Sequence, residues 1–415
     1  MERLSSLKLA LLSVLAVFAL SGGGLATIAA WQDDLTVGNV TVASGDGWGK
    51  PAEPIEFTQI AVGGGYTVAI DVDGNAWGWG ANDLGQLGDG TTVNRNTPVK
   101  VSGGHQFKQI SAGTNHMVAL DANGDAWAWG YNRYGQLGNG TSGSATNSNT
   151  PVKVSGGHKF KQIMAGTYHT VALDTNGDAW AWGYNRSGEL GNGKSGSSTK
   201  NDSNTPTQVA GGRKFKQIAT NSHNTIAIDT DGAAWSWGDN RYGQLGDGTS
   251  GTENSRNTPV KVSGGHKFKQ ISNGFIHTTA IDTNGDAWAW GRNGNGQFGN
   301  GTTTRSNIPI KVTEGYNFTQ ISAGHNYTVA IDKNDDAWAW GNNSNGQLGD
   351  GTTTSSPTPI RVAKGHKFTQ ISAGNGYTIA LDTNRHAWAW GNNSNGQLGD
   401  GTNNNSSIPI KVISR

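Results

Sequence analysis

The pattern of apolar and polar positions repeats along most of the chain. One unit runs from Pro98 to Gly130, and a Gly- and Asn-rich connection follows it. Its apolar and β-prone residues fall in four stretches: 99–101, 107–110, 116–120 and 126–129. Alternation with a period of two predicts half-buried strands, and short links containing Gly or Asn predict antiparallel neighbours. Each unit therefore predicts a four-stranded antiparallel meander, with the Pro-Val-Lys-Val stretch as its first strand.

The unit is marked by Trp-x-Trp-Gly and, after four further residues, by Gly-Gln-Leu-Gly-x-Gly or a near copy of it. Seven copies begin at Trp77, Trp127, Trp180, Trp235, Trp288, Trp338 and Trp388. Successive copies lie about 50 to 55 residues apart, and periods of this order are typical of propellers and solenoids. A β-solenoid is the structural alternative, but its rungs are usually shorter, whereas four-stranded units arranged radially make a propeller. We therefore predict an all-β, seven-bladed β-propeller of four-stranded antiparallel blades.

The repeated residues also resemble those of a known family. In the second unit they read Gly113-x-x-His116-x-Val118-Ala119-Leu120-Asp121, then Trp127-x-Trp129-Gly130-x-Asn132-x-x-Gly135-Gln136-Leu137-Gly138-x-Gly140, then Pro151. This pattern is similar to the regulator of chromosome condensation repeat, and it recurs over most of the chain. The resemblance implies a seven-bladed propeller, in agreement with the seven Trp pairs.

The two ends of the repeat region predict how the ring closes. Pro54 stands three positions before Phe57, against nine in the second unit, so the first unit lacks its own first strand. The stretch that ends at Val412 has no following Phe-x-Gln-Ile and is one strand in excess. Because an unpaired sheet edge is a liability, we predict that Ile410–Val412 pairs with Phe57–Ile60 and closes the ring.

The N-terminus carries a predicted export signal. Arg3 and Lys8 precede an apolar core at 9–20, and small residues follow up to Ala29-Ala30. This order is typical of a cleaved secretory signal peptide, and an uncleaved membrane anchor is the alternative. The residues from Gly22 to Gly45, which include a Gly triplet and Ala-Ala before Trp31, also resemble the export signals of the camelysin and biofilm-fibre families. That resemblance implies bacterial export.

We divide the chain into a signal peptide at 1–30, an N-terminal arm at 31–53 and the propeller at 54–415. The arm alternates apolar and polar residues at 35–37 and 40–42, which predicts one or two short strands outside the ring. The arm either docks on its own propeller or is flexible, or it adds a strand to the sheet of a neighbouring subunit. The second alternative implies self-association, as in an extracellular matrix or filament subunit.

Composition excludes several kinds of site. The 415 residues carry a formal net charge of +1, without the basic footprint of a nucleic-acid binder. The chain has no Cys, which excludes disulfides and thiolate metal sites. We expect no cofactor, no nucleic-acid partner and no membrane association after signal cleavage.

Three repeated features have both a structural and a functional interpretation. Trp127 and Trp129 share a sheet face, which favours packing between blades over an aromatic cage. The position of His116 is Tyr or Asn in other units, which favours a shared hydrogen-bonding role over a metal site. The Asp-x-Asn-Gly stretch that begins at Asp174 lacks the terminal Glu of a calcium loop, which favours a hairpin turn. No catalytic constellation stands out, so we expect no enzyme.

The units differ mainly at one end of the predicted ring. Strands alternate in direction, so the Ala-Gly-x-x loops and the connections after Trp-Gly share one end, here called the loop end. The Ser-Gly-Gly-His and Asn-Gly-Asp segments share the other, the turn end. Variable loops on a rigid scaffold often bind partners, and Tyr and Arg are enriched in binding hot spots; neutral drift is the alternative. The candidate partner-binding residues are Tyr131, Arg133, Tyr134, Tyr168, Tyr184, Arg186, His223, Arg241, Tyr242, Phe275 and Arg292.

These observations predict a secreted or cell-surface bacterial protein without catalytic activity, which binds a protein or glycan through the loop end. Secreted propellers of the resembled family that inhibit β-lactamases offer an analogy for this mode. One alternative is a guanine-nucleotide exchange factor and chromatin binder like the eukaryotic namesake, which the predicted signal peptide and the missing basic tail oppose. A further alternative is an enzyme such as a glycan lyase, for which no residue constellation is found.

Overall fold

The computed structural model describes residues 35–37, 40–42, 54–362 and 365–413, in two units that are considered separately. In the first unit, β1 (Leu35–Val37) and β2 (Val40–Val42) pair antiparallel in a sheet of their own. The short strands expected in the arm are therefore confirmed. The predicted signal peptide lies outside the described residues. Within the described residues, no helix has the length and apolar character needed to cross a bilayer.

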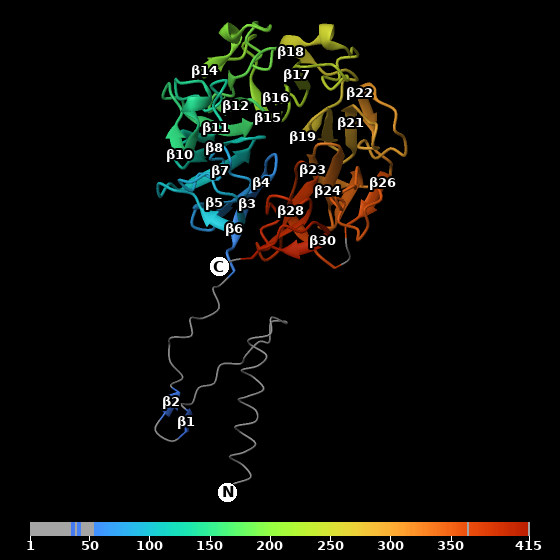
Figure 1. Ribbon diagram of the computed structural model, residues 1–415. Helices are drawn as coiled ribbons and strands as arrows, with labels where there is room; N and C mark the ends of the chain where they lie inside the picture. The colour runs from blue at the N-terminus through green and yellow to red at the C-terminus, as the bar shows by residue number, and fades with distance from the viewer. Residues whose placement is uncertain (1–34, 38–39, 43–53, 363–364, 414–415) are drawn as a thin grey trace. The chain divides into compact units, whose positions relative to one another are not determined.

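The second unit is a ring of seven four-stranded antiparallel sheets, which confirms the predicted seven-bladed propeller (Figure 1). Each blade runs from an inner strand beside a central channel to an outer strand at the rim. The inner strands are β3 (Phe57–Val62), β7 (Phe107–Ala112), β11 (Phe160–Ala165), β15 (Phe215–Thr220), β19 (Phe268–Asn273), β23 (Phe318–Ala323) and β27 (Phe368–Ala373). The second strands are β4 (Tyr66–Asp71), β8 (His116–Asp121), β12 (His169–Asp174), β16 (Asn224–Asp229), β20 (His277–Asp282), β24 (Tyr327–Asp332) and β28 (Tyr377–Asp382).

The two outer layers complete each blade. The third strands are β5 (Ala76–Gly80), β9 (Ala126–Gly130), β13 (Ala179–Gly183), β17 (Ala234–Gly238), β21 (Ala287–Gly291), β25 (Ala337–Gly341) and β29 (Ala387–Gly391). The outer strands are β6 (Arg95–Lys100), β10 (Ser148–Lys153), β14 (Ser203–Gln208), β18 (Arg256–Lys261), β22 (Ser306–Lys311), β26 (Ser356–Arg361) and β30 (Ser406–Lys411). Single 3₁₀ turns lie in three connections: η1 (Ser144–Thr146), η2 (Thr199–Asn201) and η3 (Thr252–Asn254).

The predicted order of strands within a blade is wrong by one strand. The Pro-Val-Lys-Val stretch pairs with the Trp-x-Trp-Gly strand that precedes it, as β6 does on β5, where Val99 lies opposite Gly78. The Ser-Gly-Gly-His segment therefore connects two blades and is not a hairpin. Pro98 is also not at the head of its strand. It falls in the irregular part of the register, on an outer strand with one free edge, where a missing N–H is tolerated.

The predicted closure of the ring is wrong for the same reason. β30 pairs with β29 inside blade seven, with Ile410 opposite Ala389, and does not pair with Phe57–Ile60. Blade one is complete from β3 to β6. Because every blade is built from four consecutive strands, neither end of the repeat region lacks or exceeds a strand.

Blades seven and one instead join through side chains and loops, by the same contacts as every other pair of neighbours. At each seam an inner-strand Gln accepts a backbone N–H of the next blade, as Gln109 Oε1 does from Ile163 at 3.1 Å. The second Trp of each blade donates its indole N–H to a backbone carbonyl of the preceding blade, as Trp182 does to Gln136 at 3.0 Å. At the closing seam these bonds are Gln370 to Ile60 and Trp79 to Gln397.

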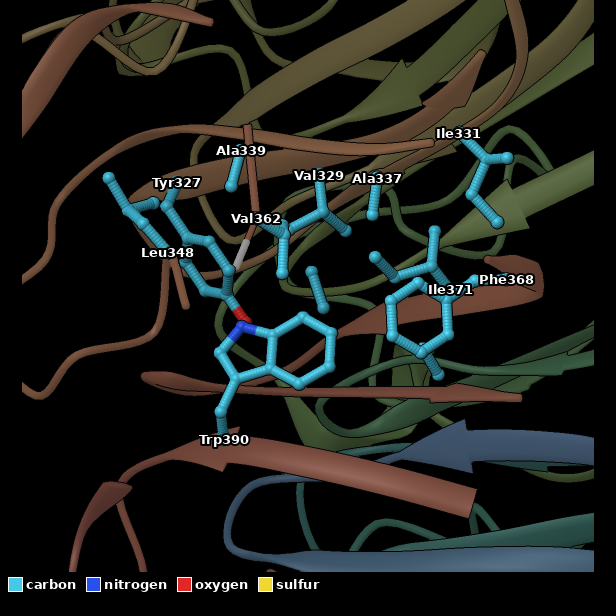
Figure 2. Packing of buried hydrophobic residues seen from close by; sticks show 12 residues of the cluster. Tyr327, Val329, Ile331, Ala337, Ala339, Leu348, Val362, Phe368, Ile371 and Trp390 are labelled. Atoms are coloured by element: carbon cyan, nitrogen blue, oxygen red, sulfur yellow. The ribbon is translucent and has the colours of Figure 1, made fainter. Parts of the chain in front are cut away.

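The core is divided among the seven seams. Figure 2 shows the seam between blades six and seven, where Trp390 and Phe368 face Val329 and Ala339. The second Trp of every pair is fully buried at such a seam, and the first is partly buried. The interpretation of the Trp pairs as packing between blades is confirmed.

Close approach explains one repeated glycine. Gly138 has φ +68°, and a Cβ there would lie 2.6 Å from Nε1 of Trp182 in the next blade. The position therefore requires both a left-handed backbone and the absence of a side chain.

The turn interpretation of the Asp-x-Asn-Gly stretches is also confirmed. Asp174 Oδ1 accepts the backbone N–H groups of Asn176 and Asp178, each at 2.9 Å. Its Oδ2 accepts the indole N–H of Trp180 at 3.3 Å. The carboxylate therefore closes the hairpin and holds the first Trp of the pair.

The buried His and Tyr at the start of the second strand share a hydrogen-bonding role, as predicted, and the bonds cross between blades. His169 Nε2 lies 3.1 Å from Thr225 Oγ1 of the next blade. At the equivalent position Tyr66 donates its hydroxyl to the His116 carbonyl at 2.8 Å. Burial lowers the pKa of His116 to about 3. Burial, with a smaller contribution from nearby His residues, does the same for His169 (His223 and His116) and His277 (His325), so these rings are neutral near pH 7.

Candidate functional site

The loop end of blades two to four carries a group of contacting aromatic rings, here called the tyrosine cluster: Tyr131, Tyr134, Tyr168, Tyr184 and His223. Ring centroids lie 5.0 Å apart for Tyr134–Tyr184, 5.3 Å for Tyr134–Tyr168 and 5.5 Å for Tyr184–His223. All five side chains are partly exposed. Separate loops from three blades thus form one continuous aromatic surface.

Each connection presents its aromatic residues because a buried Asn organises the backbone. Asn132 Oδ1 accepts the N–H of Leu137 at 3.1 Å, and its Nδ2 donates to Thr141 O at 3.2 Å. Gln136 Oε1 accepts the N–H of Tyr134 at 3.0 Å. The connection is therefore held at several points, and the Tyr rings project from an ordered loop.

Arginine side chains lie over several of the Tyr rings. The guanidinium carbon of Arg133 lies 5.8 Å from the Tyr134 centroid, and that of Arg186 lies 5.3 Å from the Tyr184 centroid. These distances are within the range of cation–π attraction. Burial and the nearby Glu189 charge raise the pKa of Tyr184 to about 12, so this phenol remains neutral.

The remaining predicted residues form smaller groups. Arg292 of blade five lies over Tyr242 of blade four, at 5.6 Å from its centroid. Phe275 stacks on His325 at 4.2 Å, beside the central channel. Arg241 is exposed and, within the described residues, takes part in none of these stacked pairs. The structure therefore brings most of the predicted residues to the loop end of blades two to five.

Sequence reasoning missed a second layer of residues, directly beneath the exposed rings. The Gln of Gly-Gln-Leu-Gly is buried in each repeat that has it. In blades four, six and seven its Nε2 donates to the residue that follows Trp-Gly. These acceptors are Asp239 at 3.0 Å, Asn342 at 2.8 Å and Asn392 at 3.3 Å. A polar residue after Trp-Gly therefore satisfies a buried amide.

In blades two, three and five that acceptor is replaced by Tyr131, Tyr184 and Arg292. Within the described residues, the buried Nε2 atoms of Gln136 and Gln297, beneath Tyr131 and Arg292, have no hydrogen-bond partner. An unsatisfied buried polar group costs about 1–3 kcal/mol. Tyr131 and Arg292 thus stand at positions where a residue with a hydrogen-bond acceptor would stabilise the fold better.

Glu189 differs from its equivalents because it is a carboxylic acid where the other six repeats have Gln. It is fully buried, and its Oε2 accepts the N–H of Ser187 at 2.8 Å. Its Oε1 lies 3.3 Å from His223 Nδ1, a distance suited to an ion pair when His223 is protonated. The single Glu among seven repeat positions was the sequence signal that could have identified this residue.

The ring also encloses a central channel of about 460 Å³, lined by the inner strands and by loop residues that include Phe275 and His325. Its walls are mainly Gln, Ser, Ala and Ile side chains and loop backbone. Among the residues that the structure describes, no group of three or more His, Asp and Glu could hold a metal ion.

Comparison with known families agrees with this architecture. Residues 15–314 match the RCC1-like domain, and residues 334–381 and 386–415 match the regulator of chromosome condensation (RCC1) repeat. The chain belongs to the RCC1-like domain family. This RCC1-like propeller thus carries an aromatic and basic surface on a scaffold that the family shares.

Curated relatives match over part of their length. The ultraviolet-B receptor UVR8 of Arabidopsis thaliana is 32% identical over 255 residues, which is 60% of this chain and 56% of UVR8. The probable E3 ubiquitin-protein ligase HERC4 of Homo sapiens is 38% identical over 246 residues, which is 58% of this chain and 23% of HERC4. The chain therefore spans about half the length of UVR8 and less of HERC4.

Solved structures show the same fold. Prp20p from Saccharomyces cerevisiae, whose binding properties to Gsp1p and histones were described with its structure, superposes with a TM-score of 0.72. It is 21% identical, over 83% of this chain and 87% of that chain. Human WBSCR16 superposes with a TM-score of 0.71, at 23% identity, over 79% of this chain and 88% of that chain.

Proposed function

We propose that this RCC1-like propeller is a non-catalytic protein-binding protein whose contact surface is the loop end of blades two to five, centred on the tyrosine cluster. The observation that carries the proposal is the pair of unpartnered buried amide groups of Gln136 and Gln297, beneath Tyr131 and Arg292. Residues that weaken a fold locally are expected at functional sites, where binding and not stability decides the side chain. Neutral drift gives no reason for an aromatic and a basic residue at these two positions.

Protein is the favoured partner class, in preference to glycan. Tyr and Arg dominate hot spots at protein interfaces because they bury much area and offer polar groups at low entropic cost. The structural relative Prp20p binds the proteins Gsp1p and histones. At its level of identity this relative supports a protein partner only by analogy.

The binding surface is tested by affinity capture with the purified chain, followed by reconstitution with the identified partner. Changing Tyr131, Tyr134, Tyr184 and Tyr242 together to Ala should abolish capture, because it removes the aromatic contact area. The melting temperature should change little, because the four rings are partly exposed.

A matched control changes Ser344, Asn345, Ser394 and Asn395 to Ala, in the equivalent connections of blades six and seven. This variant should capture the partner as the wild type does. Capture that survives the Tyr substitutions would place the contact surface elsewhere.

We further propose a secreted or cell-surface location, on the basis of the N-terminal pattern of basic, apolar and small residues that ends at Ala30. N-terminal sequencing of material recovered from the medium should begin at or near Trp31. Protein that retains Met1 and sediments with membranes would indicate an anchor instead.

A further inference from the structure

The arginines of the propeller fall into two classes, according to whether the protein supplies them with a carboxylate. One class forms ion pairs: Arg95, Arg213, Arg256, Arg361 and Arg385 each lie within 4.0 Å of an Asp or Glu oxygen. The other class has no side-chain hydrogen bond or ion pair within the described residues. Its members are Arg133, Arg186, Arg241, Arg292 and Arg305.

All members of the second class lie in the connections after the third strand of blades two to five, and all are exposed. These connections belong to the loop end, so the unpaired guanidinium groups share one side of the ring with the tyrosine cluster. The turn end, in contrast, pairs its arginines internally: Arg361 with Asp336, and Arg385 with Glu56.

One arginine of the turn end shows what the unpaired ones lack. Arg213 lies over the Trp235 ring, 3.5 Å from its centroid, and 3.8 Å from a carboxylate oxygen of Asp229. Arg186 and Arg292 lie over Tyr rings in the same manner, but with no carboxylate within ion-pair distance in the described chain. A stacked guanidinium keeps its N–H donors at its edge, where they fit a carboxylate.

The carboxylates at this part of the loop end are already engaged. Asp202 accepts the N–H of Asn185 at 2.9 Å, and Asp247 is paired with Arg256. Asp239 accepts the side-chain amide of Gln244. Glu189 is fully buried, and the exposed Glu253 accepts the side-chain amide of Asn254 at 3.1 Å. The exposed guanidinium groups are therefore left to bind a group from outside the chain.

We infer that the partner is engaged through an acidic protein segment, whose Asp or Glu carboxylates pair with the stacked arginines of blades two to five around the tyrosine cluster. This inference rests on the proposed function and specifies its chemistry. The arginines are positioned by the Tyr rings beneath them, so less side-chain freedom is lost when a carboxylate binds. Charge complementarity of this kind gives specificity and fast association.

The test measures fluorescence anisotropy of a labelled poly-glutamate peptide titrated with the mature chain. Arg133→Gln, Arg186→Gln and Arg292→Gln in one variant should weaken binding about tenfold or more, because charge-assisted hydrogen bonds are lost. The control variant changes Lys161, Lys216 and Lys269 to Gln, which removes the same charge from the turn end. It should bind within about twofold of the wild type, because exposed charges more than a Debye length away are largely screened.

Three results would overturn the inference: no binding of poly-glutamate by the wild type, equal losses in both triple variants, or tighter binding of a heparin fragment than of poly-glutamate. The last result would assign the arginines to a sulfated glycan. Replacing the three arginines by Lys should restore only part of the affinity, because an ammonium group neither stacks nor binds a carboxylate in the same bidentate geometry.

The failure of this inference can be told apart from failure of the proposed function. If the Tyr substitutions abolish capture of the natural partner while the arginine variant captures it normally, the proposed binding surface is supported and the inference of an acidic partner segment is wrong. If neither variant affects capture, the proposed surface itself is wrong.

Discussion

Blades two to five and blades six and seven share one scaffold but present different loop ends. In blades six and seven, Asn342 and Asn392 accept the amide of the buried Gln below and complete the internal hydrogen bonding. In blades two and five, Tyr131 and Arg292 occupy that position and leave the buried Gln amide below unpaired. The comparison teaches that in blades six and seven the residue after Trp-Gly stabilises the fold. In the blades that carry the candidate site, some of these residues leave buried groups unpaired and so do not.

The same division appears in the buried layer at the start of the second strands. Blades six and seven have Tyr327 and Tyr377 there, whereas blades two, three and five have His116, His169 and His277. Burial lowers the pKa of each of these His residues to about 3, and nearby His residues add to the effect at His169 and His277. The two sides of the ring should therefore respond differently to acid.

The largest expected effect is this acid sensitivity. Below about pH 6.5 the unfolded chain binds a proton at each of these His residues while the folded chain does not. The free energy of unfolding therefore decreases as the pH is lowered. The contribution of these neutral rings to stability is fully present above the pKa of His in the unfolded chain. It is lost progressively as the pH falls towards the folded-state pKa of about 3. The loss is at most about 1.4 kcal/mol per pH unit for each His. Denaturant unfolding measured from pH 7 down to about pH 4.5, where most carboxylates remain ionised, should show this slope.

The triple variant His116→Tyr, His169→Tyr and His277→Tyr should flatten that slope, because Tyr stays neutral throughout the range. A wild-type stability that does not change over the same range would contradict the assignment of acid sensitivity to these rings.

A second prediction sharpens the claim that the scaffold is equivalent on both sides. Gly138→Ala and Gly349→Ala should each cost about 2–4 kcal/mol, because the new Cβ meets an indole of the next blade and the backbone is left-handed. Gly157 has φ +67° with no atom within 4 Å of the added Cβ, so Gly157→Ala isolates the backbone cost. If thermal melts show that Gly157→Ala lowers the melting temperature as much as the other two substitutions, the clash with the indole makes no contribution.

The smallest predicted effect tests the comparison most directly. Tyr131→Asn should stabilise the fold by about 1 kcal/mol, because Gln136 Nε2 gains the acceptor that Gln347 has in blade six. The same substitution should weaken partner binding. The reverse change, Asn342→Tyr, should destabilise the fold by a similar amount and leave binding unaltered. A Tyr131→Asn variant that is no more stable than the wild type would remove the argument from unpaired atoms.

The sequence predicted the fold well because its information is repetitive. Seven Trp pairs gave the number of blades, and the alternation in each unit gave four strands. The assignment of strands to blades failed because a repeat has no intrinsic start: the Pro-Val-Lys-Val stretch lies between two candidate partners in the sequence. The structure shows that the stretch belongs to the blade before it, because Val99 pairs antiparallel with Gly78. The periodicity of the sequence does not reveal this pairing.

The candidate site was predicted in part for a related reason. Residues such as Tyr131, Tyr134 and Tyr184 stood out because the other units lack them. The unpaired atoms of Gln136 and Gln297 did not stand out, because these residues are identical in six repeats and differ only in what lies above them. That these amides lack a partner can be seen only once the positions of the side chains above them are known. The exposure of the arginines and their lack of ion pairs likewise depend on side-chain positions.

The construction of each blade from consecutive strands has a consequence for the order in which blades occur along the chain. Since the seam between blades seven and one has the same kinds of hydrogen bond as the others, no seam is distinguished except by the absence of a connecting peptide. Circular permutants cut in any Ser-Gly-Gly-His segment, with a linker joining the present ends of the ring, should therefore build the same propeller. In such permutants each blade is still encoded by one continuous stretch of the gene. Whole blades can therefore be gained or lost without dividing a sheet.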